Sequence, residues 1–440
     1  MSSIVYRIHR LLEQMLAQVG VGTNLALYYL LWSLLSGRFL LSRGAVFAAL
    51  ADLGLPPEAV RRSGAALAYG DWQSADLLVA WQALVAQEGD FHAHRHAGFC
   101  PVACDLVGFF RPRLQGCGGK HYHSQADKAL PAVVLGLVGC VGSVGKQRLC
   151  LPRLLVRPDV GDTSEKALMR KTLRQAGVCL RDDEVLVTDA GFSLSDVLAC
   201  EVARFVVRRD KNFTARRNRA PAYSGQGRPP KKGEIVRPLA RSYRGKNLPA
   251  TPADKVVEWV SQGRRIRAAV FLDLVLPDAK PGCASFWCAV IVDPRYKEPL
   301  VLATNLPVSA FGLAALYRDR WPIEQLPLAA KQMLGAERAF VFGKESRYRL
   351  PELTLLAGNL LSYGAATSQP VATGFWDRCA RPTCGRLRRV LLRLRFSELP
   401  PPGGQLHKKS SPTAHLPKGV KGHRRHKAVT GPWDGYRKAA

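Results

Sequence analysis

The chain has 440 residues, enough to bury a substantial core in two or three domains, and its formal net charge is +30 at pH 7. Residues 1–90 carry six bases and seven acids, so the positive charge lies after residue 90 and favours a polyanionic partner such as nucleic acid. Eleven cysteines without C-x-x-C spacing, no signal-peptide pattern and no membrane-spanning apolar run argue against a secreted or membrane protein and predict a cytoplasmic one.

Residues 1–90 are predicted to form an all-helical domain, with helices at 25–35, 45–53 and 58–69. The last two are joined by a Gly-Leu-Pro-Pro turn, which gives the form of a DNA-reading helix-turn-helix. A plain helical bundle is the other interpretation, and the near-neutral charge of this segment favours the bundle. A role of this domain in binding DNA ends therefore stays open.

Residues 92–96 read H-x-H-x-H, and two cysteines follow at 100 and 104. Alternate residues of a strand lie on one face, so His92, His94 and His96 could belong to a metal site. No second pair of ligands has zinc-site spacing, however, and an exposed loop rich in histidine is the commoner explanation. We therefore interpret this segment as an exposed loop and not as a metal site.

The next segment predicts three strands, a helix and a fourth strand, at residues 99–110, 129–138, 147–156, 163–176 and 184–188. An antiparallel meander joined by a parallel strand predicts an α/β fold. Two acids lie in this pattern.

Asp105 lies inside the first of these strands, and Asp189 ends the fourth. A carboxylate at such a position is costly unless its charge is compensated, and a divalent cation would compensate it. The alternative for Asp105 is an outward-facing position on a half-exposed strand. The alternative for Asp189 is an ordinary strand-end turn beside Gly191.

Residues 204–246 contain fourteen Lys and Arg interleaved with aromatic residues, a composition that suits a surface for the phosphate backbone. At its centre Arg228 lies in a Gly-Arg-Pro sequence like that of a minor-groove arm, with Lys231 and Lys232 just after it, although a flexible solvated loop is at least as good an explanation. Alternating strands follow at 265–275, 286–292 and 299–304. Trp259 and Trp287 are candidates for stacking on DNA, and core positions are the more common role.

Four polar residues stand out in segment 316–333, namely Tyr317, Arg320, Glu324 and Lys331. In an unbroken helix they would lie within one narrow arc, where an acid can ligate a hard cation while the bases hold phosphate oxygens. An ordinary i,i+4 pair of Arg320 and Glu324 is the alternative. Pro322 and Pro327 interrupt the pattern, so we expect the first two residues in an entry segment and a kink before the last.

The spacing Y-x2-R-x3-E-x6-K, with Trp321 and Ile323 inside it, resembles the YREK signature of insertion-sequence-4-type DDE transposases. The resemblance implies a ribonuclease-H-like catalytic core in which Asp105, Asp189 and Glu324 are the catalytic metal ligands for Mg2+, with Mn2+ as a substitute. It implies that Tyr317, Arg320 and Lys331 contact DNA. The implied reaction is Mg2+-dependent strand cleavage and strand transfer at the ends of an insertion sequence.

The same resemblance implies an α/β core interrupted by a β-rich insertion, between an all-helical N-terminal domain and a basic, disordered C-terminal tail. The expected boundaries are 1–90 for the helical domain, 95–205 and 309–370 for the two parts of the core, 206–308 for the insertion and 371–440 for the basic region.

The implied partners are double-stranded DNA, as terminal inverted repeats and target, and a second copy of the chain on paired ends. The implied place is the bacterial nucleoid. A catalytically inactive or domesticated DNA-binding protein derived from a transposase is the alternative function. A nuclease or glycosidase using the same carboxylates is a third, and the charge of +30 speaks against a glycosidase.

Overall fold

A computed structural model gives the fold and describes residues 3–19, 24–111, 114, 119–162, 164–223, 225, 230–279, 282–338, 341–372, 374–394, 396–399, 402–403 and 406. The chain divides into two compact units. We call the first the helical unit; it comprises Met1–Glu88, Phe109–Cys117 and Leu328–Ala440. We call the second the sheet unit; it comprises Gly89–Gly108 and Gly118–Pro327.

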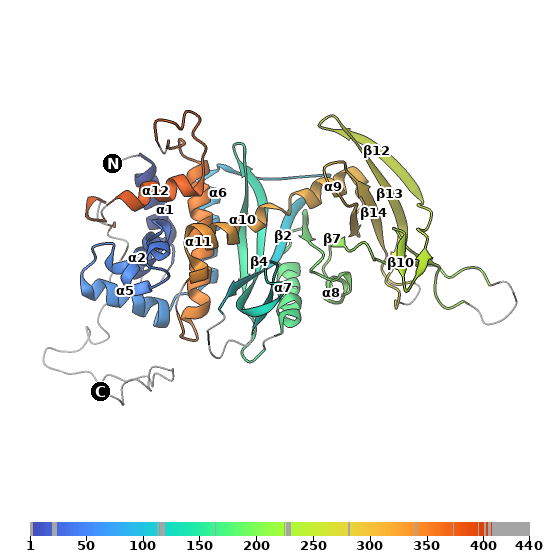
Figure 1. The fold of residues 1–440 in the computed structure, drawn as a ribbon, viewed down its shortest axis with the longest axis horizontal. Coiled ribbons are helices and arrows are strands. Elements are labelled where there is room, and N and C mark those ends of the chain that lie inside the picture. The colour runs from blue at the N-terminus through green and yellow to red at the C-terminus, as the bar shows by residue number, and fades with distance from the viewer. Residues whose placement is uncertain are drawn as a thin grey trace. The chain divides into compact units, whose positions relative to one another are not determined.

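The helical unit is built on a buried central helix, α11 (Ser346–Ala366), whose side chains are inaccessible over almost its whole length. Around it pack helices from both ends of the chain, which Figure 1 draws in blue and orange. The further helices are α1 (Ser3–Ala17), α2 (Asn24–Leu35), α3 (Arg38–Leu41), α4 (Val46–Ala51), α5 (Pro57–Tyr69), α6 (Ser74–Glu88), η1 (Ala329–Met333), η2 (Ala336–Arg338), α12 (Cys384–Arg393) and η3 (Phe396–Glu398).

One buried cation ties α11 to the N-terminal helices. Arg349 donates to the carbonyl oxygens of Gly70, at 2.8 Å, and Trp72, at 3.2 Å, and its guanidinium lies 4.7 Å from the centre of the Trp72 ring. Backbone acceptors and an aromatic face satisfy a charge that would otherwise be costly to bury. The helices predicted at 25–35, 45–53 and 58–69 are confirmed as α2, α4 and α5.

The sheet unit contains one large mixed sheet, so the predicted α/β class is confirmed. Its strands follow the order β1-β4-β2-β6-β7-β15-β14-β13-β8-β9, while β5 and β3 pair with β4 and β12 pairs with β13. The strands are β1 (Phe91–Ala93), β2 (Cys100–Phe110), β3 (Lys120–His123), β4 (Lys128–Val144), β5 (Gln147–Val156), β6 (Glu184–Thr188), β7 (Phe205–Arg209), β8 (Ala215–Arg217), β9 (Ile235–Val236), β12 (Lys255–Ser261), β13 (Arg264–Val275), β14 (Phe286–Val292) and β15 (Leu300–Thr304). A separate hairpin joins β10 (Arg241–Tyr243) and β11 (Lys246–Leu248).

Helices cover both faces of the central strands. On one face Leu186 and Val207 pack with Leu173 of α7 (Glu165–Cys179) and Val197 of α8 (Leu194–Ala199). On the other face the alternate strand residues pack against α9 (Ala310–Arg318), through Val185, Val187, Val206, Leu313 and Leu316. Both faces of β6 are therefore buried, which explains its uninterrupted apolar sequence.

The strands after β7 continue this sheet, as Figure 1 shows in green to ochre. β15 pairs antiparallel with β7, β14 with β15 and β13 with β14. The strands predicted at 265–275, 286–292 and 299–304 are confirmed as β13, β14 and β15 within one residue at each end.

Among the described residues no helix is long and apolar enough to cross a membrane. Helix α12 lies in the expected basic region, and four of its ten residues are arginines. Arg228 and most of the C-terminal tail lie outside the described residues, as does Thr163, where the first helix of the core was predicted to begin.

Candidate active site

The first two acids reach one level of the sheet because their strands are parallel neighbours. β2 pairs with β6 in the register Ala103 to Val187, so two residues further on Asp105 stands opposite the position of Asp189. Val185 and Val187 pack on the face covered by α9, and side chains alternate along a strand. Strand register and alternation therefore direct both acids to the face that α9 covers.

Local hydrogen bonds orient these carboxylates. Asp105 Oδ1 accepts from the backbone N–H of Leu106 at 2.8 Å, and Asp189 Oδ1 accepts from that of Gly191 at 2.9 Å. The Asp105 side chain is 27% exposed. One oxygen of each acid is thus held by the backbone, while the second Asp105 oxygen faces a cation.

That cation is Arg320, which lies between α9 and α10 (Pro322–Leu328). Its Nη1 atom lies 3.6 Å from Asp105 Oδ2, and its Nη2 atom forms an ion pair with Glu324 Oε1. The Arg320 side chain is only 10% exposed, whereas Glu324 is 42% exposed. The i,i+4 ion pair of Arg320 and Glu324, which was the alternative explanation of this segment, is present. Arg320 also faces Asp105 on β2.

The three acids influence one another electrostatically. The pKa of Asp105 is raised to about 6, chiefly by burial and to a smaller extent by the negative charges of Asp189 and Glu324, although Arg320 and the Leu106 N–H oppose the shift. Burial lowers the pKa of Arg320, but Tyr317 and the three acids outweigh burial and raise it. A carboxyl with a raised pKa among like charges is a feature of functional sites.

The donor set suits a hard divalent cation, because all three acids offer oxygen ligands and their charges exceed that of Arg320. In the structure the oxygen atoms of the three acids do not all lie within 4.8 Å of one another. Among the described residues, one different group of potential metal ligands is that compact. Asp105, Asp189 and Glu324 could therefore hold Mg2+ once their side chains draw together.

Segment 316–333, in which we expected Tyr317 and Arg320 in an entry segment and a kink before Lys331, is divided into three elements. α9 ends at Arg318, α10 begins at Pro322, and a π-helical turn, η1, follows. Proline at the first helical position is favourable, whereas Pro327 lacks the N–H that an α-helix needs at that position. Tyr317 lies in the last turn of α9, half-buried against the core.

Lys331 belongs to η1 in the helical unit, and its contacts lie there. Its Nζ atom is 3.7 Å from Glu337 Oε1 and about 5.5 Å from the ring centres of Phe109 and Phe110. Burial lowers its pKa despite the opposing effect of Glu337. The structure therefore brings Tyr317, Arg320 and Glu324 together with the two aspartates within the sheet unit, whereas Lys331 belongs to the helical unit.

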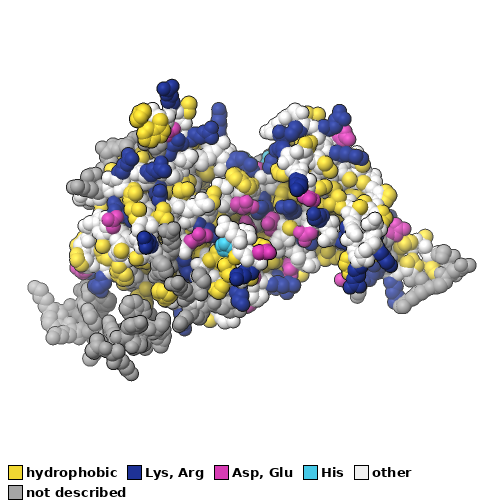
Figure 2. Space-filling model, in the orientation of Figure 1, with side chains coloured by type: hydrophobic (Ala, Val, Ile, Leu, Met, Phe, Trp, Pro, Cys, Tyr) yellow, Lys and Arg dark blue, Asp and Glu magenta, His cyan; other side chains and the backbone are white. Residues whose placement is uncertain are grey.

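A groove of about 640 Å³ opens beside Tyr317 and Arg320. Aromatic and basic side chains make up more than half of its lining, among them the exposed Trp321, and the acids Asp293 and Glu298 line it too. The lining cations are Arg148, Arg208, Arg295, Lys297, Arg318 and Arg320. Figure 2 shows Lys and Arg side chains on this face of the strands that follow β7, with Asp and Glu side chains among them.

The insertion residues predicted to bind DNA have different environments. Lys231 is exposed, and Lys232 donates to the Pro277 carbonyl oxygen at 3.1 Å. Trp259 packs edge-on against Phe311 and lines the groove. Trp287 is anchored by a 2.7 Å hydrogen bond to the Leu306 carbonyl oxygen, the core role that was the more common expectation.

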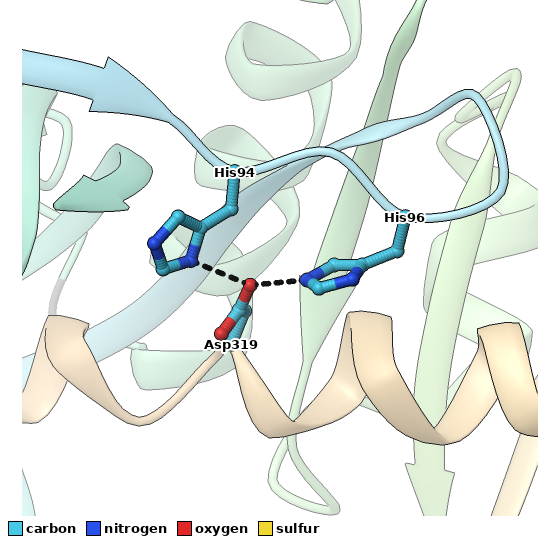
Figure 3. Close-up of side chains that lie close together, drawn as sticks. All are labelled: His94, His96 and Asp319. Carbon is cyan, nitrogen blue, oxygen red and sulfur yellow. Dashed lines mark hydrogen bonds and ion pairs between the residues drawn. The ribbon is translucent and has the colours of Figure 1, made fainter.

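A second group of side chains was missed from the sequence. His94 Nδ1 and His96 Nε2 lie 2.8 and 2.6 Å from the same oxygen, Asp319 Oδ2 (Figure 3). The interpretation of residues 92–96 as an exposed loop is therefore wrong for these two histidines, whose side chains are 22% and 30% exposed. His92 alone remains exposed. The H-x-H spacing was the available signal, but its third partner is more than 220 residues away.

Comparison with known proteins adds no family assignment: no protein-family model matches the chain, and the search of curated proteins gave no match.

Proposed function

We propose that the chain is a DDE transposase of the insertion-sequence-4 type, which cleaves and joins DNA strands with Mg2+ held by Asp105, Asp189 and Glu324. The observation that carries the proposal is the convergence of these three acids, from β2, the end of β6 and α10, around Arg320. The YREK spacing and the two aspartates were selected from the sequence independently of any distance.

The strand order supports a ribonuclease-H-like core. The meander β2-β4-β5, the crossover helix α7 and the parallel strands β6 and β7 follow the order that the resemblance implies. The strands β8 to β15 stand between the second and third acids, where the related transposases carry a β-rich insertion.

The chain's own residues would bind and orient the DNA. Cations along the groove can pair with phosphates, and Trp321 offers an aromatic face that is 52% exposed. Tyr317 and Arg320 line this groove, and Arg320 also faces Asp105 and Glu324. When bound, Mg2+ would supply charge neutralisation and activation of a water or 3′-hydroxyl nucleophile.

The test uses a plasmid carrying the gene with its flanking genomic DNA, incubated with the purified full chain and Mg2+. We expect strand breaks at fixed positions flanking the gene and a loss of cleavage by at least about 10³-fold in Glu324→Ala. The matched control is Asp159→Ala, at an acid that is 71% exposed, pairs with Lys171 and does not line the groove.

Equal cleavage by wild type and Glu324→Ala would overturn the proposal. A wild-type chain that binds the flanking DNA but never cuts it in Mg2+ or Mn2+ would instead establish the alternative, an inactive DNA-binding derivative. Retention of all three acids and all four YREK residues favours the enzyme.

A further inference from the structure

The cluster of His94, His96 and Asp319 has the composition of a metal site distinct from the three-acid cluster. Two imidazole nitrogens and one carboxylate oxygen meet within 4.8 Å of one another, and both rings point at the same oxygen (Figure 3). We propose that these three side chains bind a divalent transition-metal ion of the Zn2+ class, with a water completing the coordination.

The backbone fixes both histidines in this arrangement. The N–H of His94 donates to the Val141 carbonyl oxygen at 3.0 Å, which holds the loop against β4. His96 and Phe99 exchange two backbone hydrogen bonds of 2.8 and 2.9 Å across a tight turn. That turn places Ala97 and Gly98 at φ values of 50° and 89°, a conformation in which glycine is unstrained. The loop therefore presents its two rings without having to order on binding.

The carboxylate is also held from behind. Asp319 follows the last residue of α9, and its Oδ1 atom accepts from Arg148 Nη2 at 2.5 Å. Arg148 is held in turn by a 2.9 Å bond to the Arg318 carbonyl oxygen. Oδ2 is thus left for the two imidazoles. A partner behind a ligating carboxylate fixes its orientation, as the outer residues of metal sites do.

Burial and ligand type select the class of ion. The Asp319 side chain is 7% exposed, while the two rings are accessible enough for an ion to enter and a water to remain. Two nitrogens and one oxygen suit Zn2+, Co2+ or Fe2+, whereas Mg2+ prefers oxygen alone.

Such an ion would join the loop after β1 to the turn between α9 and α10. Asp319 directly precedes Arg320, so an ion at Asp319 would stiffen the backbone that positions the arginine between its acids. The site would act on the active site by positioning and not by contact with DNA.

The test measures Zn2+ binding to the full chain after chelation and dialysis, by equilibrium dialysis with elemental analysis. We expect His94→Ala, His96→Ala and Asp319→Asn each to weaken the affinity of this site for Zn2+ at least tenfold. At Zn2+ concentrations that just fill the site in wild type, each variant should therefore bind one equivalent less. His92→Ala is the matched control, since it removes the exposed histidine of the same H-x-H-x-H segment and should leave binding unchanged. Equal Zn2+ stoichiometry in wild type and all three variants would overturn the proposal.

Co2+ provides a second readout that needs no variant. Its visible absorption should show nitrogen and oxygen ligands at one equivalent in the wild-type chain, and a hundredfold excess of Mg2+ should not displace it. Absence of this spectrum, or its loss with Mg2+, counts against the site even if the substitutions impair folding. Glu324→Ala should lose DNA cleavage but keep Co2+ binding at this site. Failure of the transposase proposal would therefore appear in the cleavage assay, and failure of this site in the Co2+ spectrum.

Discussion

The Nη1 atom of Arg320 lies 3.6 Å from the Oδ2 atom of Asp105, and among the described residues this nitrogen has no hydrogen-bond partner. The guanidinium therefore faces the Asp105 carboxylate without forming a hydrogen bond to it. Its other terminal nitrogen pairs with Glu324. Arg320 thus balances part of a charge of three carboxylates, and the remaining negative charge is what a divalent cation would neutralise.

Replacing Arg320 should increase the effect of Mg2+ on stability. In Arg320→Gln the acids lose the cation between them, so we expect a lower melting temperature in a chelating buffer and a larger increase on adding Mg2+ than in wild type. Thermal unfolding with and without Mg2+ measures both. Arg318→Gln, in the same turn, is the control and should respond like wild type. Identical Mg2+ increments in Arg320→Gln and wild type would contradict this account.

Asp105→Asn should stabilise the chain when divalent ions are absent. The pKa of Asp105 in the folded chain is about 6, above its ordinary 3.8, so wild type loses stability as pH rises between these values. At pH 8 we expect the variant to have a higher free energy of unfolding, by at most about 3 kcal/mol, and at pH 3.5 no difference.

Denaturant titrations at the two pH values measure this effect. Asp278→Asn, at a fully exposed acid, should stay within about 0.5 kcal/mol of wild type. A destabilised Asp105→Asn at pH 8 would show that the carboxylate is held favourably and does not oppose folding.

A different acid should give the opposite pH dependence. Glu184 is 4% exposed and pairs with both terminal nitrogens of Arg153, at 2.6 and 2.7 Å. Burial alone would raise the pKa of Glu184, but Arg153 and the Arg181 N–H outweigh burial and lower it. This stabilisation is present above the unfolded pKa near 4.5 and is lost as pH falls through the lower folded value.

We therefore expect Glu184→Gln to reduce the free energy of unfolding by about 3 kcal/mol at pH 7, because the Arg153 charge loses its partner. The difference should narrow below pH 4.5, where wild type also loses the carboxylate charge. Glu165→Gln removes a 38% exposed acid paired with His121 and serves as the comparison. A deficit that does not change between pH 7 and pH 3 would refute the ion-pair explanation.

Cations of the groove should determine the salt dependence of DNA binding. Arg208 and Lys297 line it and are exposed. The double variant Arg208→Gln, Lys297→Gln should bind DNA more weakly, and the slope of log affinity against log salt should fall by about 2. Fluorescence anisotropy across a salt series measures the slope. Arg61→Gln, at an exposed base on α5, should leave it unchanged.

Periodicity in the sequence predicted most elements, because burial on one or two faces imposes a pattern of apolar residues. The strand at 184–188 was located to the residue, and β13 to β15 within one residue at each end. The pairing of β15 with β7 was not predictable, since each strand's pattern records which of its faces is buried and not which neighbour supplies its hydrogen bonds.

The same limit applies to the site. Asp105 and Asp189 could be selected because a charged residue interrupts or ends an apolar strand, and Glu324 through its spacing from Arg320. Asp319 gave no such signal, because an acid beside an arginine in a turn is an ordinary sequence feature. Only the packing of α9 on the sheet brings it to His94 and His96.

The pairing of β15 with β7 also has a consequence for engineering. β7 lies between β6 and β15 and forms hydrogen bonds with both. The insertion therefore cannot be removed without taking away one of the two neighbours of β7. A truncated chain lacking the strands after β7 would expose a bare edge on an apolar strand, a template for intermolecular pairing. Shortened versions of this protein should therefore keep β15, or replace it with another strand, to avoid aggregation.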